Sequence, residues 1–446
     1  MATILINLSK YILIFFMLFY TLFGFLMMRV KDADKLKKRA VVQNVIMFVI
    51  FTICSVTCMY YKWSVNTLVF FLLEFVYLIL FIVLYRLIYP DCSIQIVNNM
   101  SMLMMLGFVM VERLAPSSAF KQFVIVLIGT VIGFFVPRFM RKRHTIVKMK
   151  YLFAVIGILM LGITLVLGKT TWGAQISVDI AGFSFQPSEF VKLIYVLFVA
   201  AMLWRARTFG RVVASAAIAA LHVLVLVASN DLGTALIFFV VYIVMLYVGT
   251  GKIRYLIAGL LTGCGAAVFA YKVFSHVRTR VYAWRDPWSI IDKGGYQITQ
   301  SLFAIGTGGL FGMGLYQGLP NTIPVAVKDF VFAAMSEEFG MIFAICVILI
   351  CFGSYMSMMR VATRSRDIFY KLVAVGFSTM YIFQCFLTIG GVTKFIPSTG
   401  VTLPFVSYGG SSILCSILMF AIVQAVFILV KENEGDEAES KEPKKA

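Results

Sequence analysis

Residues 232–249, with the sequence LGTALIFFVVYIVMLYVG, form a run of 18 positions that contains no charged side chain. A helix of about 20 such residues is long enough to cross the hydrocarbon core of a bilayer. Similar apolar runs recur along the chain between short polar breaks, and 61% of its 446 residues are hydrophobic. Because the runs are continuous rather than alternating, they exclude an outer-membrane barrel. The sequence therefore predicts an all-α polytopic membrane protein.

The apolar runs predict thirteen membrane helices. The first run lacks an A-x-A cleavage site and is followed by RVKDADKLKKR, so we expect a retained helix rather than a cleaved signal peptide. The expected spans lie near residues 11–29, 40–61, 66–88, 98–114, 119–137, 150–168, 187–204, 211–228, 232–249, 255–274, 330–352, 370–390 and 404–430.

The net charge of +19 follows from basic residues that are concentrated in alternate loops. This distribution is typical of membrane topology, in which positive loops face the cytoplasm. It therefore does not indicate a nucleic-acid partner. The rule places the N-terminus outside and the tail 431–446, KENEGDEAESKEPKKA, inside the cell. The charged composition of this tail predicts disorder.

Two segments stand out between the expected helices on the outer side. Residues 169–186 form a moderately long connection, and residues 275–329 form the one large outer loop, which Asp329 closes. The eight cysteines include no CxxC pair, and a lone histidine in this loop does not make a metal site. The sequence thus predicts no metal centre.

The stretch 325–340, VAVKDFVFAAMSEEFG, places charges in an apolar setting. Asp329 is either the N-cap of the expected helix 330–352 or a functional carboxylate. Glu337 and Glu338 would lie roughly 12 Å deeper along that helix. Carboxylates at membrane depth face the bundle or a cavity and pair with Arg or Lys.

Two further polar motifs flank helices. In GFSFQPSEFVKL, residues 182–193, Glu189 and Lys192 are three positions apart and share a helix face. They form either a local ion pair at a capped helix or a buried pair that shapes a polar cavity. In SNDLGTALIFF, Asn230 and Asp231 fit the cap of the next helix, and a structural role is favoured.

Two glycine-rich stretches are expected near the outer surface. Residues 295–318, GYQITQSLFAIGTGGLFGMGLYQG, lack a strand and a GK[ST] pattern, which argues against a nucleotide loop. A closely packed or flexible segment near a phosphate-bearing lipid fits better. Residues 390–412, GGVTKFIPSTGVTLPFVSYGGSS, should break a helix and either line a wet cavity or form a simple kink. In the first case Ser407, Tyr408 and Ser411 would line it.

These stretches, together with RVYAWRDPW at 280–288, resemble the SEDS family of shape, elongation, division and sporulation proteins, which comprises FtsW, RodA and SpoVE. The resemblance covers roughly residues 95–430. It implies a ten-helix glycosyltransferase membrane domain at 95–430. This chain departs from the family by about three extra helices in 1–94, which fit an added partner-docking module, and the cytoplasmic tail 431–446 follows the domain.

The resemblance implies a peptidoglycan glycosyltransferase in the cytoplasmic membrane of a bacterium, which serves cell division, elongation or sporulation. Its substrate would be lipid II, the undecaprenyl-pyrophosphate-linked disaccharide-peptide, and its partner a class B penicillin-binding protein, a transpeptidase. Asp329 would be the catalytic acidic residue. A lipid II flippase and a non-catalytic scaffold for the penicillin-binding protein are the alternatives.

The implied chemistry assigns roles to the polar residues. An acceptor hydroxyl that attacks the anomeric carbon loses a proton, so one carboxylate, Asp329, suffices as general base in an inverting reaction. Positive charge should neutralise the departing pyrophosphate, and Lys328 would either do so or lower the pKa of Asp329. A divalent cation, Mg²⁺ or Mn²⁺, is compatible with this chemistry, although no ligand cluster argues for one. The expected substrate-binding residues in an outer cavity are Lys328, Arg280, Arg278, Glu189, Lys192, Lys394, Ser407, Tyr408 and Ser411.

Overall fold

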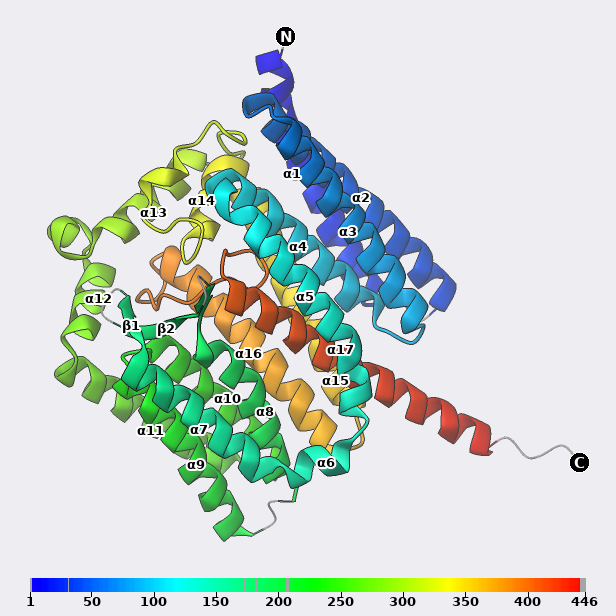
Figure 1. The fold of residues 1–446 in the computed structure, drawn as a ribbon, viewed down its shortest axis with the longest axis vertical. Coiled ribbons are helices and arrows are strands. Elements are labelled where there is room, and N and C mark those ends of the chain that lie inside the picture. The colour runs from blue at the N-terminus through cyan, green and yellow to red at the C-terminus, as the bar shows by residue number, and fades with distance from the viewer. Residues whose placement is uncertain (1, 31, 172–173, 181–182, 206–207, 442–446) are drawn as a thin grey trace, which may run out of the picture.

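The computed structural model describes residues 2–441 except 31, 172–173, 181–182 and 206–207. Within this part of the chain the fold is a bundle of long helices with one small sheet (Figure 1). The helices of the first half are α1 (Ala2–Met27), α2 (Ala33–Tyr61), α3 (Val65–Ile88), α4 (Ile94–Leu114), α5 (Pro116–Met140), α6 (Arg143–Lys148), α7 (Lys150–Leu167), α8 (Pro187–Leu203) and α9 (Phe209–Ala228). Those of the second half are α10 (Leu232–Thr250), α11 (Ile253–Val273), α12 (Ser275–Arg285), η1 (Trp288–Lys293), α13 (Tyr296–Gly308), η2 (Pro320–Thr322), α14 (Val331–Phe339), α15 (Met341–Arg364), α16 (Ile368–Val392) and α17 (Gly410–Lys441).

Helix ends follow the local sequence. Pro116 and Pro187 occupy the first turns of α5 and α8, where the missing N–H costs no hydrogen bond. Asp231 caps α10 by accepting the N–H of Thr234, and Gly251 ends the same helix with φ 68°. The expected cap at Asp231 is therefore confirmed.

Among the described residues, 12 helices are long and apolar enough to cross a membrane. They are α1–α5, α7, α9–α11 and α15–α17. α8, with 17 residues, lies at the predicted span 187–204 and packs against α7, α10 and α16. The fold class predicted from the apolar runs, a polytopic all-helical membrane protein, is confirmed.

Three details of the prediction were wrong. The expected helix 330–352 is divided at Gly340, whose φ is 88°, into α14 and α15. The last helix begins at Gly410 rather than near 404, because residues 393–409 form an irregular connection. α17 then continues to Lys441, through most of the tail that was expected to be disordered.

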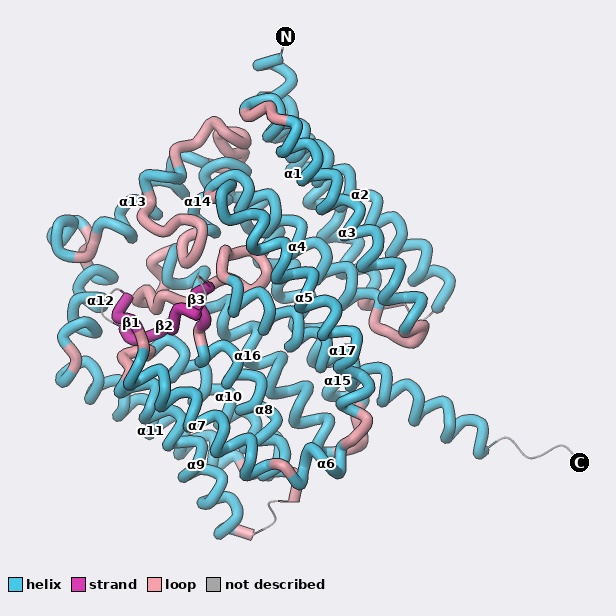
Figure 2. Tube along the Cα trace, viewed as in Figure 1, coloured by secondary structure: helices cyan, strands magenta, loops and turns pink. Residues whose placement is uncertain are grey.

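The connection at 169–186 contains a sheet that the sequence did not predict. Its strands are β1 (Lys169–Thr171), β2 (Ala174–Ile180) and β3 (Phe183–Phe185), which pair antiparallel in the order β1-β2-β3. Figure 2 shows the strands and the longer loops on one side of the helical bundle. We call the end of the bundle formed by residues 275–340 and 390–412 the loop end.

The helices α1–α3 lie beside α4, and α1 also packs against α15 (Figure 1). A buried polar network fastens them there. The side-chain amide of Asn98 donates to Gln43 at 2.9 Å, and its oxygen accepts from Arg86 at 3.0 Å. The hydroxyl of Tyr20 donates to the carbonyl of Asn98 at 2.9 Å. Interhelical hydrogen bonds of this kind stabilise helix association where no water competes.

Candidate active site

Three polar segments that are distant in sequence meet at the loop end. The hydroxyl of Ser407 donates to the carbonyl of Lys328 at 2.6 Å, and the N–H of Tyr408 donates to the carbonyl of Val327 at 2.8 Å. The N–H of Gln186 donates to the hydroxyl of Ser411 at 3.0 Å. The segments 182–193, 325–340 and 390–412, which the sequence assigned to one outer site, are therefore in direct contact.

Asp329 does not cap a helix. The N-cap position of α14 belongs to Phe330, and no side chain caps this end. The carboxylate of Asp329 is half-buried and has no hydrogen-bond partner within the described part of the chain. An acceptor group that remains uncommitted beside an exposed lysine, Lys328, is available to an incoming ligand.

Asp329 faces Arg280 across a glycine. A Cβ atom built on Gly400 would lie 3.7 Å from Oδ2 of Asp329 and 3.8 Å from Nη2 of Arg280. Burial raises the pKa of the Asp329 carboxyl above its ordinary value, and the charges of Lys328 and Arg280 oppose that rise. A raised pKa makes the carboxylate a better proton acceptor near neutral pH.

The other two cations predicted for this site lie less close. Arg278 is exposed on α12, the helix that carries the half-buried Arg280. Lys394 has a left-handed backbone with φ 58°, and its carbonyl accepts the indole N–H of Trp284 at 3.1 Å. This bond fastens the 390–412 segment to α12. The structure therefore groups Lys328 and Arg280 with Asp329 but gives no such contact for the charges of Arg278 or Lys394.

Glu189 and Lys192 form a buried ion pair on α8. Nζ of Lys192 lies 2.7 Å from Oε1 of Glu189 and 3.2 Å from Oε1 of Gln384. The amide of Gln384 donates to the carbonyl of Thr402 at 3.0 Å. The hydroxyl of Thr402 is 2.7 Å from that of Ser412. The local ion pair is confirmed, and it is buried and belongs to a polar network under the loop end. That the pair shapes a polar cavity stays a prediction.

The sequence assigned Asp231 only a structural role, yet this residue contacts α8 and also acts on Arg280 of α12. One carboxylate oxygen caps α10, and the other accepts the hydroxyl of Ser188 at 3.3 Å. Its charge also acts on Arg280. Burial lowers the pKa of the Arg280 guanidinium, and the nearby carboxylates of Asp329 and Asp231 raise this pKa. The clue in the sequence was an acidic residue beside an asparagine, Asn230, at the start of an apolar run.

Glu337 and Glu338 lie in the last turn of α14, which ends at Phe339, so they are at the end of a short helix rather than inside the expected span 330–352. The expected pairing with a cation is confirmed for Glu338: Nη2 of Arg113, at the end of α4, lies 2.8 Å from its Oε1. Oε1 of Glu337 accepts the N–H of Leu319 at 2.9 Å. The two carboxylates thus fasten the glycine-rich loop that precedes Asp329.

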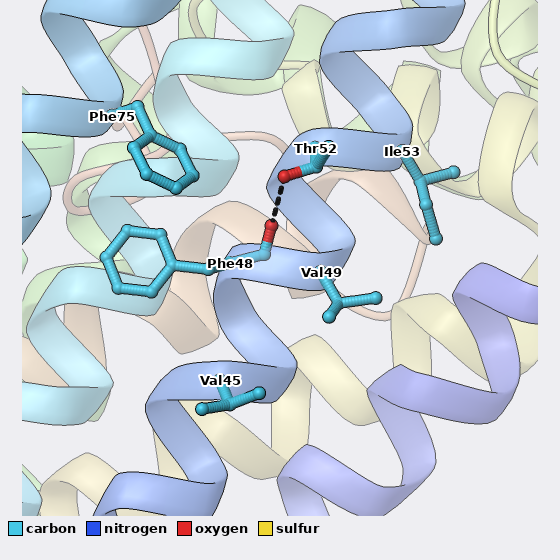
Figure 3. Close-up of a pocket in the computed structure, with 6 residues that line it drawn as sticks. All are labelled: Val45, Phe48, Val49, Thr52, Ile53 and Phe75. Carbon is cyan, nitrogen blue, oxygen red and sulfur yellow. Dashed lines mark hydrogen bonds between the residues drawn. The ribbon is translucent and has the colours of Figure 1, made fainter.

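One hollow of about 370 Å³ lies away from this site (Figure 3). Its lining is apolar except for the hydroxyl of Thr52, which donates to the carbonyl of Phe48. Such a surface on α2 and α3 suits lipid chains rather than sugars. The lining residues are Val45, Phe48, Val49, Thr52, Ile53 and Phe75.

Comparison with known proteins places these residues in context. A family model described as cell cycle protein, FtsW, RodA and SpoVE, matches residues 91–431. The peptidoglycan glycosyltransferase RodA of Mycobacterium tuberculosis is 34% identical over 350 residues, which cover 72% of this chain and 75% of that protein. The stage V sporulation protein E of Bacillus subtilis is 34% identical over 263 residues, which cover 57% of this chain and 72% of that protein.

A solved structure shares the fold. It belongs to a peptidoglycan synthase complex that coordinates polymerization and crosslinking, and it aligns with a TM-score of 0.66 at 25% identity. The alignment covers 75% of this chain and 97% of that one. The residues that form α1–α3 precede the part matched by the family model.

Proposed function

This chain belongs to the FtsW, RodA and SpoVE family of cell cycle proteins, and we propose that Asp329 is the general base with which it builds peptidoglycan strands. It is a multi-pass membrane protein and a peptidoglycan glycosyltransferase, as its relatives are. The observation that carries the assignment is the uncommitted, half-buried carboxylate of Asp329 beside Arg280.

The proposed substrate is lipid II, and the proposed reaction is a single displacement. A sugar hydroxyl of one lipid-linked substrate attacks the anomeric carbon of a second lipid-linked substrate. The proton of this hydroxyl passes to the carboxylate of Asp329. The new C–O bond forms as the bond to the pyrophosphate oxygen breaks, and undecaprenyl pyrophosphate leaves with the electron pair. One displacement inverts the anomeric configuration. A second acid is unnecessary, because pyrophosphate is already a good leaving group.

Arg280 and Lys328 are the proposed partners of the pyrophosphate. Charge develops on the leaving group as the bond breaks, and fixed cations lower the barrier by stabilising it. Arg280 is half-buried at the carboxylate, so its charge is screened less than that of the exposed Lys328. A divalent cation bound to the pyrophosphate could share this role, and chelation by EDTA during the assay tests for it.

The proposed orientation places the N-terminus outside and the tail inside the cell, so that the loop end faces the lipid-linked sugars. The proposed partner is a class B penicillin-binding protein that crosslinks the strands. The support is the related synthase complex, in which polymerization and crosslinking are coordinated.

The test is polymerisation of labelled lipid II by the purified full-length protein with its partner. Wild type and Asp292→Asn, which changes an exposed aspartate of the same outer region, should make glycan strands. Asp329→Asn should make none while retaining the fold. Equal product from Asp329→Asn would refute the base. A flippase would move labelled lipid II across vesicles in both forms, and a scaffold would support growth in both.

A further inference from the structure

The helices α1 and α2 touch the loop that precedes the catalytic segment. The ring of Tyr61, at the end of α2, stacks on that of Tyr316, with centroids 5.3 Å apart and planes 13° apart. The side-chain amide of Gln317 donates to the hydroxyl of Tyr61. On α1, the ammonium group of Lys10 donates to the carbonyl of Gly312 at 3.0 Å. Three contacts therefore join the N-terminal helices to the loop 309–319.

That loop in turn holds the far end of α14. The N–H of Met313 donates to the carbonyl of Glu337 at 2.9 Å, and the N–H of Gly314 donates to that of Glu338 at 2.8 Å. The N–H of Leu319 donates to the side chain of Glu337 at 2.9 Å. Backbone donors of one loop thus bind both the main chain and a carboxylate of α14.

Tyr316 is the point where both sets of contacts meet. Its N–H donates to Oε1 of Glu338 at 3.2 Å, and the guanidinium of Arg113 lies 4.2 Å from its ring centroid. Its φ is 69°, a conformation that a bulky residue adopts only where its surroundings hold it. The stacked ring of Tyr61 is part of those surroundings.

α14 connects the loop 309–319 to the catalytic carboxylate of Asp329. The helix has nine residues and begins at Val331, two positions after Asp329. A short helix with intact hydrogen bonds moves as a unit. The chain just before Asp329 is fastened by the bond from Ser407 to the carbonyl of Lys328. Asp329 therefore lies between two fastened points, of which the one at Glu337 and Glu338 is held by the loop that α1 and α2 contact.

We propose that α1 and α2 act as a brace that positions Asp329: Tyr61 and Lys10 hold the loop 309–319, and the loop holds α14. This inference rests on the proposed function of Asp329 as the base. Tyr61 is a positioning residue, since nothing places it at the substrate. The residues 1–90 lie outside the match to the family model, so the brace is an addition to the part of the chain that the family shares.

The test uses the full-length protein and four variants. Tyr61→Ala removes the stacked ring, and Tyr61→Phe keeps it. Lys10→Met removes the bond to Gly312. Trp63→Ala is the control, because Trp63 is an aromatic residue of the same connection with 69% exposure and no ring contact among the described residues. The readouts are kcat and KM for polymerisation of lipid II and amide hydrogen exchange of residues 309–319.

Tyr61→Ala should lower kcat about tenfold, because a small displacement of a catalytic group is costly. Its KM should stay within about twofold, since lipid II binding is untouched. Exchange of 309–319 should rise in Tyr61→Ala and stay near the wild-type level in Tyr61→Phe and Trp63→Ala. Lys10→Met should also lower kcat. If Tyr61→Ala does not fold, Lys10→Met is the variant that tests the proposal.

The brace is overturned if Tyr61→Ala has the same kcat as Trp63→Ala. If Tyr61→Ala does not fold, Lys10→Met is compared with Trp63→Ala in its place. A variant that changes KM but not kcat would also overturn the brace. Asp329→Asn, assayed in parallel, separates the two proposals. If it is inactive while the Tyr61 and Lys10 variants are fully active, only the brace is refuted. If Asp329→Asn polymerises normally, the base is refuted, and unchanged exchange of 309–319 in Tyr61→Ala would then refute the brace as well.

Discussion

Asp329 and Arg280 approach the same α-carbon, that of Gly400, from two different segments of the chain. A Cβ atom at this position would lie within 3.8 Å of both side chains. Gly400 itself has φ +72°, in the region that favours glycine. The carboxylate and the guanidinium therefore lie close to the same glycine. The attacking hydroxyl of one lipid-linked sugar and the pyrophosphate of the other would meet a base and a cation side by side.

Arg280 should matter more than Arg278. Arg280→Ala removes the half-buried cation at Asp329, and we expect kcat to fall by about 10²–10³, the scale for a lost charge-stabilising group. Arg278→Ala is the matched control on the same helix; its exposed charge is screened by water, so kcat should change by less than about threefold. Steady-state polymerisation of lipid II measures both. Similar losses in the two variants would contradict the placement of the pyrophosphate at Arg280.

The pH dependence of polymerisation should report the carboxyl of Asp329. A general base works only when deprotonated, so the rate falls as pH drops below its pKa. Burial raises this pKa, and the acid limb should lie above the value of about 4 typical of an exposed aspartate. Lys328 lowers the pKa, so Lys328→Ala should move the limb to higher pH.

The shift should be modest, because Lys328 is exposed and water screens its charge. Lys38→Ala, a change of an exposed lysine in the second turn of α2, is the control and should leave the limb in place. The measurement is kcat/KM between pH 4 and 9. A limb that moves to lower pH in Lys328→Ala would contradict Asp329 as the titrating base.

The positions of the membrane helices could be predicted because the apolar runs are about as long as a bilayer needs and are separated by polar breaks. The thirteenth expected span, 187–204, corresponds to α8, whose 17 residues make it shorter than the 12 membrane helices among the described residues. The break at Gly340 could not be predicted. Both α14 and α15 are apolar, and what divides them is tertiary: a Cβ on Gly340 would lie 2.3 Å from the N of Gly312. The sheet at 169–185 was missed because its strands are short and lie between two strong helical signals.

The candidate site was predictable to the extent that polar residues in an apolar chain are informative. Asp329, Glu189 and Lys192 were found in this way. The connecting roles of Asp231 and Gln384 depend on contacts between segments more than 40 positions apart, such as the bond from Ser188 to Asp231. A single sequence contains no signal for such pairs, since a capping aspartate and a linking aspartate look alike.

The buried pair of α8 should be costly to break. Lys192→Ala leaves the carboxylate of Glu189 buried without its cation, and we expect a loss of about 3–5 kcal/mol in the free energy of unfolding. The double variant Glu189→Gln, Lys192→Met removes both charges and should recover part of this loss. Thermal unfolding in detergent checks the order. A double variant less stable than Lys192→Ala would show that the pair is not the source of the penalty.

Two neighbouring glycines of α13 allow a direct test of how closely the glycine-rich loop must approach α14. A Cβ on Gly308 would lie 2.1 Å from the carbonyl oxygen of Ser336, whereas nothing lies within 4 Å of a Cβ on Gly306. Gly308→Ala should therefore lower stability by about 1–3 kcal/mol, the cost of an overpacked contact. Gly306→Ala should be neutral or stabilising by up to about 1 kcal/mol, because alanine favours a helix over glycine. Unfolding temperatures of the two variants measure the difference. Because the contact at Gly308 is with backbone that cannot rotate away, equal stability of the two variants would mean that α13 and α14 are not packed as closely as the loop end requires.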